Sequence, residues 1–498
     1  MGIVVRQSLK SAILTLAGAA LGGVVMLLSI SVFGKQDYGF QQSLQKYATL
    51  ISYFCILGYN YTVLIFGQKY DSKHPARGVF LRLTFIIPLI VALVTAVLMV
   101  LLKPLLLAMF KLEDIPLMDR YYLFFPIFMV INVVMMWLEG YLQSIHKSAV
   151  QNFIREILLR IINILLIGLF FADVIDFDGF VALFVLFYIL PVLLLVVVAR
   201  KSSGFHFKGS KELLLKAERN EIYKFSAYHM LGVVGVVLIF QMDALLIPPF
   251  SKNGLEDAAV YATAIFAVAL MRNPARVIGV AATPAFTQTY NEGNIRELAS
   301  LYSRSSVNMQ ITALIMFLLI ALNLDSAMIL LAQVKPGYEM VKPLILVLMI
   351  GQVIEMGAGP NFELIGVTKY YRFNFWIAIA LLAAIIVLNV WLIQQFGIIG
   401  AAWATTSGLV LFNIAKALFL WKKLKIQPFT NATWKIIAIG IVIGTVVWFI
   451  PFLGNVYLDI ALRSTLSGLM LWVLLYKFNV SPELSEITRN IIYKRKLF

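Results

Sequence analysis

Long uninterrupted apolar runs are the feature that most constrains this chain. Residues 83–102 contain no charged side chain, and about 20 such residues are what an α-helix needs to cross the hydrocarbon core of a bilayer. A membrane β-barrel would instead show shorter segments that alternate in polarity. The composition agrees, with 61% hydrophobic and 13% charged residues, whereas soluble proteins carry about 25% charged residues. We therefore expect an all-α polytopic membrane protein.

Charges, prolines and glycines divide the chain into fourteen expected transmembrane spans. These cover residues 11–33, 41–66, 83–102, 121–142, 154–172, 178–199, 224–248, 257–285, 307–331, 341–365, 373–394, 398–420, 434–452 and 456–476. The even number places both termini on one side. About three-quarters of the 41 Lys and Arg residues fall in segments on that side, and the positive-inside rule identifies it as cytoplasmic. We expect a multi-pass membrane protein with cytoplasmic termini.

The remaining composition excludes several kinds of chemistry. The single cysteine, Cys55, allows no internal disulfide, and the four histidines are scattered without the spacing of metal ligands. We expect no metal site, no cofactor and no enzymatic activity. The net charge of +16 is spread over the cytoplasmic segments, which predicts an attraction for anionic lipids rather than a nucleic-acid interface.

Similar residues recur when the chain is shifted by about 220 positions, a kind of internal repeat that many transporters contain. Tyr38 falls over Tyr261, Gly58 over Gly279, and Gly179 over Gly400. The repeat predicts two six-helix lobes, related by an axis along the membrane normal. The lobes would cover residues 1–200 and 224–423, joined by a basic cytoplasmic connector, 201–223, and followed by two further helices and a cytoplasmic tail, 424–498.

Two arginines stand inside the expected span 257–285. Arg272 and Arg276 are four residues apart, so they share one helical face, and Pro274 between them removes a backbone hydrogen bond. Each arginine at the centre of a bilayer costs about 2.5 to 3.5 kcal/mol unless it is paired or hydrated. Arginine suits phosphate oxygens because its planar fork donates two parallel hydrogen bonds. The pair is therefore our first candidate for an anion-binding site.

Three acidic residues within expected spans are singled out as candidates. Glu139 is the expected structural partner of Arg155 or Arg160. Glu355 stands near the middle of its span, where it would either form a structural ion pair with the arginines of span 257–285 or neutralise them in one state only. Asp243 lies in the outer part of its span, where it either helps to end the helix or takes part in coupling to a cation.

Several short motifs resemble the polysaccharide flippases of the multidrug/oligosaccharidyl-lipid/polysaccharide exporter superfamily, abbreviated MOP. The motifs follow one another in the order of the family and cover most of the chain; they are "RQSLKSAIL", "FGKQDYGFQQSL", "LGYNYTVLIFGQKY", "MDALLI", "AVYATA" and "FGIIGAAWATT". The resemblance implies fourteen helices in two lobes plus a final pair. It also implies a monomer that exports an undecaprenyl-diphosphate-linked oligosaccharide across a bacterial inner membrane by alternating access, with polysaccharide assembly proteins as possible partners.

The resemblance extends to individual positions. Some relatives hold Na⁺ between the helices that correspond to spans 224–248, 373–394 and 398–420, which makes Asp243, Thr405 and Thr406 candidates for coupling to Na⁺ or H⁺. Lys46 and Asn60 in the first lobe could face the same cavity as the arginine pair, although Lys46 could instead reach the outer interface.

Three other functions compete with this one. A lipid II flippase would share the fold and the anionic substrate, but span 11–33 lacks the arginines usual in that branch. A cation-coupled multidrug or metabolite antiporter would favour an acidic cavity. A membrane glycosyltransferase or polymerase would require a large outer loop with catalytic acids, and the longest expected outer loop covers only residues 103–120.

Overall fold

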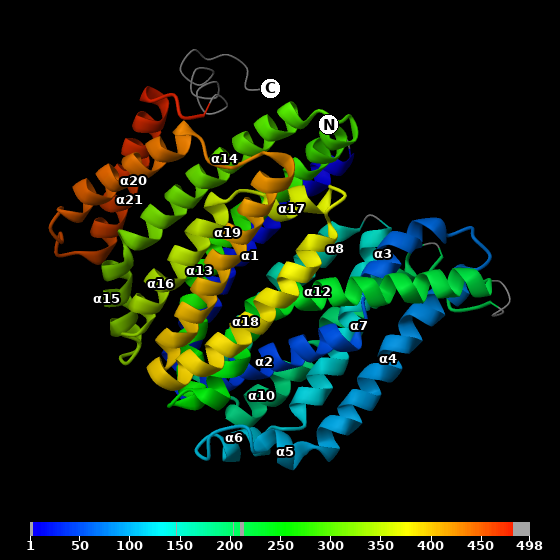
Figure 1. The fold of residues 1–498 in the computed structure, drawn as a ribbon. Helices are drawn as coiled ribbons and strands as arrows, with labels where there is room; N and C mark the ends of the chain where they lie inside the picture. The colour runs from blue at the N-terminus through cyan, green and yellow to red at the C-terminus, as the bar shows by residue number, and fades with distance from the viewer. Residues whose placement is uncertain (1–2, 146, 203, 210–213, 482–498) are drawn as a thin grey trace. The chain divides into compact units, whose positions relative to one another are not determined.

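The fold is helical throughout the part of the chain that the computed structural model describes, residues 3–145, 147–202, 204–209 and 214–481 (Figure 1). Nine helices in these ranges are long and apolar enough to cross a membrane, or ten if one bent pair counts as a single span. The expected class, an all-α polytopic membrane protein, is confirmed.

The chain forms two compact units, Met1–Ala259 and Val260–Phe498. The first, unit 1, contains α1 to α12 and the start of α13. Its helices are α1 Ile3–Val32, α2 Lys35–Cys55, α3 Tyr59–Lys69, α4 Arg77–Leu101, α5 Lys103–Leu107, α6 Ile115–Arg120, α7 Phe124–Ser144, α8 Ser148–Phe153, the π-helix η1 Ile154–Leu158, α9 Leu159–Phe171, α10 Phe177–Leu186, α11 Ile189–Arg200 and α12 Lys216–Phe250.

The second unit, unit 2, contains most of α13 and all later helices. These are α13 Gly254–Asn291, α14 Ile295–Ala321, α15 Leu324–Val334, α16 Val341–Gly357, α17 Asn361–Gly366, α18 Arg372–Phe396, α19 Ile398–Leu424, α20 Asn431–Trp448 and α21 Val456–Lys477. An apolar core that includes Val307, Ile443 and Leu471 packs α20 and α21 against α14. The final helix pair is therefore an integral part of unit 2.

The division between the units falls inside α13, later in the chain than the connector 201–223 where the sequence places the boundary of the lobes. The helix before it, α12, packs along α2 and α3 of unit 1. At Gly58, with φ of +77°, an added Cβ would lie 2.5 Å from the carbonyl oxygen of Ser226. Such a close backbone approach requires glycine. The internal repeat itself stays a prediction.

Several of the expected continuous spans are interrupted or shifted. Span 41–66 is broken between α2 and α3, which meet at a bend of 47°. Span 341–365 is broken between α16 and α17, at Gly359 with φ of +69° and Pro360. Span 307–331 begins earlier, at Ile295, because the polar residues that the expectation excluded form the capped first turns of α14, and it ends at Ala321.

Candidate functional site

The residues that the sequence singles out divide between the two units. Lys46, Asn60 and Asp243 belong to unit 1. The others, Arg272, Arg276, Glu355, Thr405 and Thr406, belong to unit 2.

The arginine-bearing face of α13 is the first part of the site in unit 2. The helix is continuous through Pro274. Arg272, Arg276 and Gly279 stand at positions i, i+4 and i+7, which form one stripe along a helix. Arg272 is half-buried and interacts within the protein, whereas the side chain of Arg276 lies outside the described part.

Gly279 brings this stripe against a carboxylate from another helix. A Cβ added to Gly279 would lie 2.7 Å from Oε1 of Glu363, at the centre of the short helix α17. The Glu363 carboxylate therefore occupies the space that a side chain at position 279 would fill. Arg272 and Gly279 are separated by about 10 Å along the axis of α13, so a negative charge lies on the same face as the arginines.

The break between α16 and α17 gives this region its shape. Ending α16 at Gly357 frees backbone carbonyls that side chains from α14 satisfy. Gln310 Nε2 donates to the carbonyl of Gly357 at 2.9 Å, and Tyr302 Oη donates to the carbonyl of Ala358 at 2.8 Å. Non-helical backbone at membrane depth is tolerated only where protein or a polar cavity surrounds it, and broken helices mark the binding sites of many transporters.

A buried lysine completes the charged region. Lys416 on α19 is 3% exposed, and its Nζ lies 3.9 Å from the ring centroid of Phe412. The negative charges of Glu355 and Glu363 act on Lys416, yet no ion pair within 4.0 Å joins it to them in the described part. Glu355, Glu363 and Lys416 interact electrostatically. We call these three residues, together with Arg272 and Arg276, the unit 2 charge cluster; the proximity of the two arginines to the other three residues stays a prediction.

The structure places Glu355 beside an amide and near a lysine. It accepts a hydrogen bond from Gln352 Nε2 at 2.9 Å, one turn earlier on α16. Its electrostatic neighbours include Lys416 and Glu363. Its pairing with the arginines of α13 stays a prediction.

The remaining candidates, Thr405, Thr406 and Asp243, are buried. Thr406 Oγ1 donates to the carbonyl of Val347 at 2.9 Å, which ties α19 to α16. Thr405 and Asp243 are buried at 8% and 5% exposure, and both interact within the protein. No group of three or more His, Cys, Asp or Glu side chains within the described ranges could hold a metal ion.

Lys46 and Asn60 stand on the two parts of the broken span of unit 1. Lys46 is half-buried on α2 and interacts within the protein. Asn60 is half-buried in the first turn of α3, just after the break. Their place in a common cavity stays a prediction.

Two members of the charge cluster escaped the sequence analysis. Lys416 lies inside the expected span 398–420, four residues from its cytoplasmic end, and counts there among the basic residues of the cytoplasmic side. Glu363 stands next to the expected end of a continuous span. The dipeptide Gly359-Pro360 within that span is the signal that could have revealed the broken helix and drawn attention to its charges.

Unit 1 contains a second set of charges within its helices, arranged as direct ion pairs. Nη1 of Arg155 lies 3.2 Å from Oε2 of Glu139, which confirms the expected structural partnership. Nη2 of Arg160 lies 2.8 Å from Oε2 of Glu156, one turn away. Arg155 and Glu156 belong to the π-helix η1.

One further acid of unit 1 lies in the loop 103–120, outside the spans. Asp114 is 3% exposed, and it accepts hydrogen bonds from Gln36 Nε2 and from the backbone N–H of Leu255, both at 3.0 Å. It thereby satisfies a free N–H at the start of α13. Burial raises the pKa of the Asp114 carboxyl above its usual range, despite the opposing effect of these two hydrogen bonds.

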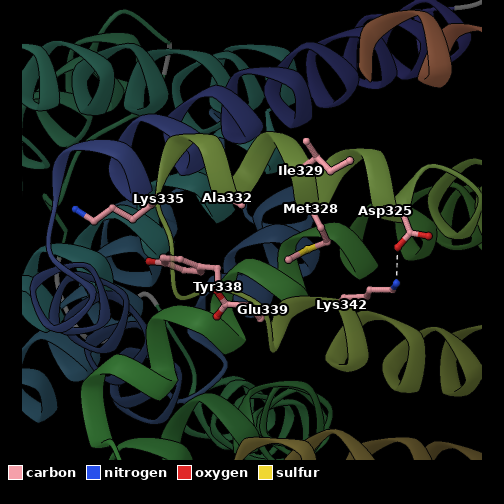
Figure 2. Close-up of a pocket in the computed structure, with 8 residues that line it drawn as sticks. All are labelled: Asp325, Met328, Ile329, Ala332, Lys335, Tyr338, Glu339 and Lys342. Atoms are coloured by element: carbon pink, nitrogen blue, oxygen red, sulfur yellow. Dashed lines mark hydrogen bonds and ion pairs between the residues drawn. The ribbon is translucent and has the colours of Figure 1, made fainter. Parts of the chain in front are cut away.

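A pocket of about 440 Å³ lies elsewhere in unit 2, between α15 and α16. Figure 2 shows Asp325 and Lys342 joined by an ion pair at one end and Lys335 at the other. Lys342 and Glu355 are separated by about 20 Å along α16, and the pocket contains none of the candidate residues. The pocket is therefore separate from the candidate site.

Comparison with solved structures identifies the fold. The lipid II flippase MurJ in an inward closed conformation has a TM-score of 0.69 and 12% identity, over 94% of this chain and 98% of MurJ. A multidrug resistance MATE family transporter of the MOP superfamily in an inward-facing conformation has a TM-score of 0.64 and 13% identity, over 82% of this chain and 94% of that chain.

A MOP superfamily transporter from Pyrococcus furiosus, whose binding pocket is described as having reverse polarity, has a TM-score of 0.54 and 15% identity, over 84% of this chain and 96% of that chain. No protein-family model and no curated protein matches the sequence. The chain therefore has the fold of the MOP superfamily transporters, a multi-pass membrane fold, as the sequence resemblance predicts.

Proposed function

We propose that this protein is a flippase that moves an undecaprenyl-diphosphate-linked oligosaccharide from the cytoplasmic to the outer face of the inner membrane for surface polysaccharide synthesis. The observation that carries this proposal is the basic character of the charge cluster. Lys416 is buried at 3% exposure inside a membrane helix, and the same unit carries Arg272 and Arg276 on one face of α13. Buried membrane charges are expensive, so they are retained chiefly for function.

The chemistry of the cluster suits a diphosphate. Arginine forks bind phosphate oxygens in a bidentate manner, and the lysine adds a point charge. The diphosphate is the one anionic group that lipid-linked oligosaccharides share, whatever their sugars. Glu355 and Glu363 would hold the cations while the site is empty, and the substrate would replace them. This exchange would couple binding to a rearrangement of the broken helix α16–α17.

A lipid II flippase is the second candidate. Lipid II also presents a diphosphate, and the MurJ structure matches 94% of this chain, compared with 82% for the MATE transporter. A cation-coupled antiporter is less compatible because three of the five residues of the charge cluster are basic. A glycosyltransferase or polymerase would require an extended outer loop, which the span assignment does not provide.

Transport could be coupled to Na⁺ or H⁺ through Asp243, with Thr405 and Thr406 as further candidates. Asp243→Asn keeps the shape of the side chain and removes its charge. We expect this variant to remain folded and inserted but to transport more slowly. Unchanged transport with an unchanged dependence on Na⁺ and pH would reduce Asp243 to a structural residue.

The orientation has its own test. Reporter fusions after Lys423 and Phe498 should read cytoplasmic, and a fusion after Asp176 should read external, because basic residues concentrate on the side of the termini. A C-terminus on the outer side would contradict the fourteen-span topology.

The deciding experiment on function is complementation of an export-deficient strain. We expect Arg272→Ala or Arg276→Ala to abolish or severely weaken export, and the Lys variants to retain part of it because lysine lacks the planar fork. Each Ala variant is combined with Glu355→Ala, and membrane abundance is measured alongside. A purely structural pair predicts that the double variant regains abundance and export together. Normal export by well-folded Arg272→Ala/Arg276→Ala would reject the diphosphate clamp.

A further inference from the structure

The π-helix η1 of unit 1 contains a π-turn that brings two arginines, Arg155 and Arg160, to one face of the helix. The backbone N–H of Leu159 donates to the carbonyl of Ile154, five residues earlier. Such a wide turn adds one residue to an otherwise α-helical segment, and π-turns of this kind occur often at functional sites. In a regular helix, residues five apart point about 140° away from each other. Across the π-turn, Arg155 and Arg160 are instead spaced as residues four apart would be, and they share a face.

Other contacts place both guanidinium groups in one polar region. Both act electrostatically on the hydroxyl of Tyr188, which is 5% exposed. Gln45 Nε2 of α2 donates to this hydroxyl at 3.4 Å. The region therefore gathers side chains from α2, from η1 and α9, and from the segment between α10 and α11, all within unit 1.

The arginines in this region retain donors that the two carboxylates do not satisfy. Glu139 meets Arg155 through one oxygen only, and the Arg155 side chain is 44% exposed, compared with 8% for Glu139. Nε of Arg160 is buried without a hydrogen-bond partner in the described part. Buried donors without partners are costly, and a ligand with several acceptor oxygens would satisfy them.

Glycine makes room for the second carboxylate. A Cβ added to Gly18 of α1 would lie 2.7 Å from Oε2 of Glu156. Helix α1 thus approaches the Glu156–Arg160 pair closely. A carboxylate that is held between an arginine and a helix backbone can be displaced by a stronger anion, provided that α1 moves.

We propose that Arg155 and Arg160 form a second oxyanion-binding site in unit 1, in which Glu139 and Glu156 are resident anions that the ligand replaces. This inference rests on the proposed function, since the ligand would be an anionic group of the transported lipid-linked glycan. Two groups share the required chemistry, the diphosphate and the carboxylate of an acidic sugar. A second site would let the substrate be held at two points.

The test uses the full-length protein in nanodiscs of uncharged phosphatidylcholine, with inorganic pyrophosphate, glucuronate and uncharged glucose as probes. The background variant is Arg272→Ala/Arg276→Ala/Lys416→Ala, which removes the basic residues of the unit 2 charge cluster. Binding is measured by calorimetry and by the shift in unfolding temperature. We expect this background to bind one oxyanion probe and not glucose.

Further substitutions in the same background assign the site. Arg155→Lys or Arg160→Lys should weaken probe binding by about tenfold, because a bidentate contact becomes a point contact. Glu139→Gln should tighten binding several-fold, because a competing carboxylate is removed, although a merely structural pair would predict only lower stability. Arg463→Ala is the matched control, since Arg463 pairs with Asp459 at 2.8 Å one turn away on α21 and should leave probe binding unchanged.

The outcomes separate this inference from the proposed function. Binding of pyrophosphate alone assigns the diphosphate to the site, and binding of glucuronate alone assigns an acidic sugar. The inference is overturned if neither oxyanion binds the background variant, or if Arg155, Arg160 and Glu139 substitutions leave binding unchanged. Normal export by Arg272→Ala/Arg276→Ala would reject the unit 2 clamp without affecting this result.

Discussion

The π-turn region of unit 1 and the charge cluster of unit 2 hold their charges differently. In unit 1 each arginine of the π-turn region meets a carboxylate directly, at 3.2 Å for Arg155 and Glu139 and at 2.8 Å for Arg160 and Glu156. In unit 2 the acids of α16 and α17 act on Lys416 without an ion pair within 4.0 Å in the described part. Direct pairs stabilise an empty site, whereas a charge held at a distance keeps its capacity for a ligand. We therefore expect the ion pairs of unit 1 to contribute mainly to stability and Lys416 of unit 2 to contribute mainly to export.

The largest effect should come from removing the lysine of unit 2. Lys416→Ala is expected to lower export by about 10- to 100-fold, the equivalent of one or two lost charge-assisted hydrogen bonds. Stability should hardly fall, because a buried charge without a direct pair contributes little to it. The measurements are export by complementation and the unfolding temperature in detergent. Lys422→Ala, an exposed lysine on the same helix, is the control and should export normally.

Breaking a direct ion pair of unit 1 should instead lower stability. Glu139→Ala is expected to lower the free energy of unfolding by about 1 to 2 kcal/mol, a value reduced from that of a fully buried pair because Arg155 is 44% exposed. The double variant with Arg155→Ala should lose less than the sum of the two single losses. Additive losses in a double-mutant cycle would show that the two residues do not stabilise each other.

A smaller effect should follow from filling the space at Gly279. The added methyl of Gly279→Ala would lie 2.7 Å from Oε1 of Glu363, so the flexible carboxylate must move relative to Lys416. We expect export to fall about two- to fivefold. Stability should change little, because the better helix propensity of alanine, about 1 kcal/mol, offsets the displacement. Gly444→Ala, where nothing lies within 4 Å, should export normally, and equal export by both variants would remove the carboxylate from the mechanism.

The sequence was sufficient for the class of fold because continuous apolar runs are a direct consequence of bilayer thickness. It also limited the partner of Glu139 to Arg155 or Arg160, and the structure selects Arg155. The interruptions were harder to predict. The break at Gly359 and the π-turn at Ile154 are local changes of hydrogen bonding that leave hydropathy unaltered.

The charge cluster was predictable only in part, for a related reason. Arg272 stands out because its span is otherwise apolar. Lys416 and Glu363 do not, because they lie near span ends, where charges usually reach the interface. Only the packing of α17 against Gly279 and the burial of Lys416 on α19 distinguish them from ordinary flanking charges.

The smallest predicted effect concerns a carboxylate that has hydrogen bonds but no ion pair within 4.0 Å in the described part, and it extends the comparison to pH. Burial raises the pKa of Asp114 above the usual 3.8. Since the folded state holds this proton more tightly than the unfolded state, the contribution of the protonated carboxyl to stability is complete below pH 3.8 and is lost as pH rises through the folded pKa.

The substitution Asp114→Asn keeps an acceptor for the N–H of Leu255 and removes the charge. We expect the variant to unfold at a slightly higher temperature than the wild type at pH 7 and at the same temperature in acid, with the exposed Glu292→Gln as control. The opposite result would be a variant that unfolds at a lower temperature than the wild type at pH 7 but at the same temperature in acid. It would mean that the ionised carboxylate stabilises the start of α13 by more than its burial costs. Asp114 would then resemble the paired acids of unit 1.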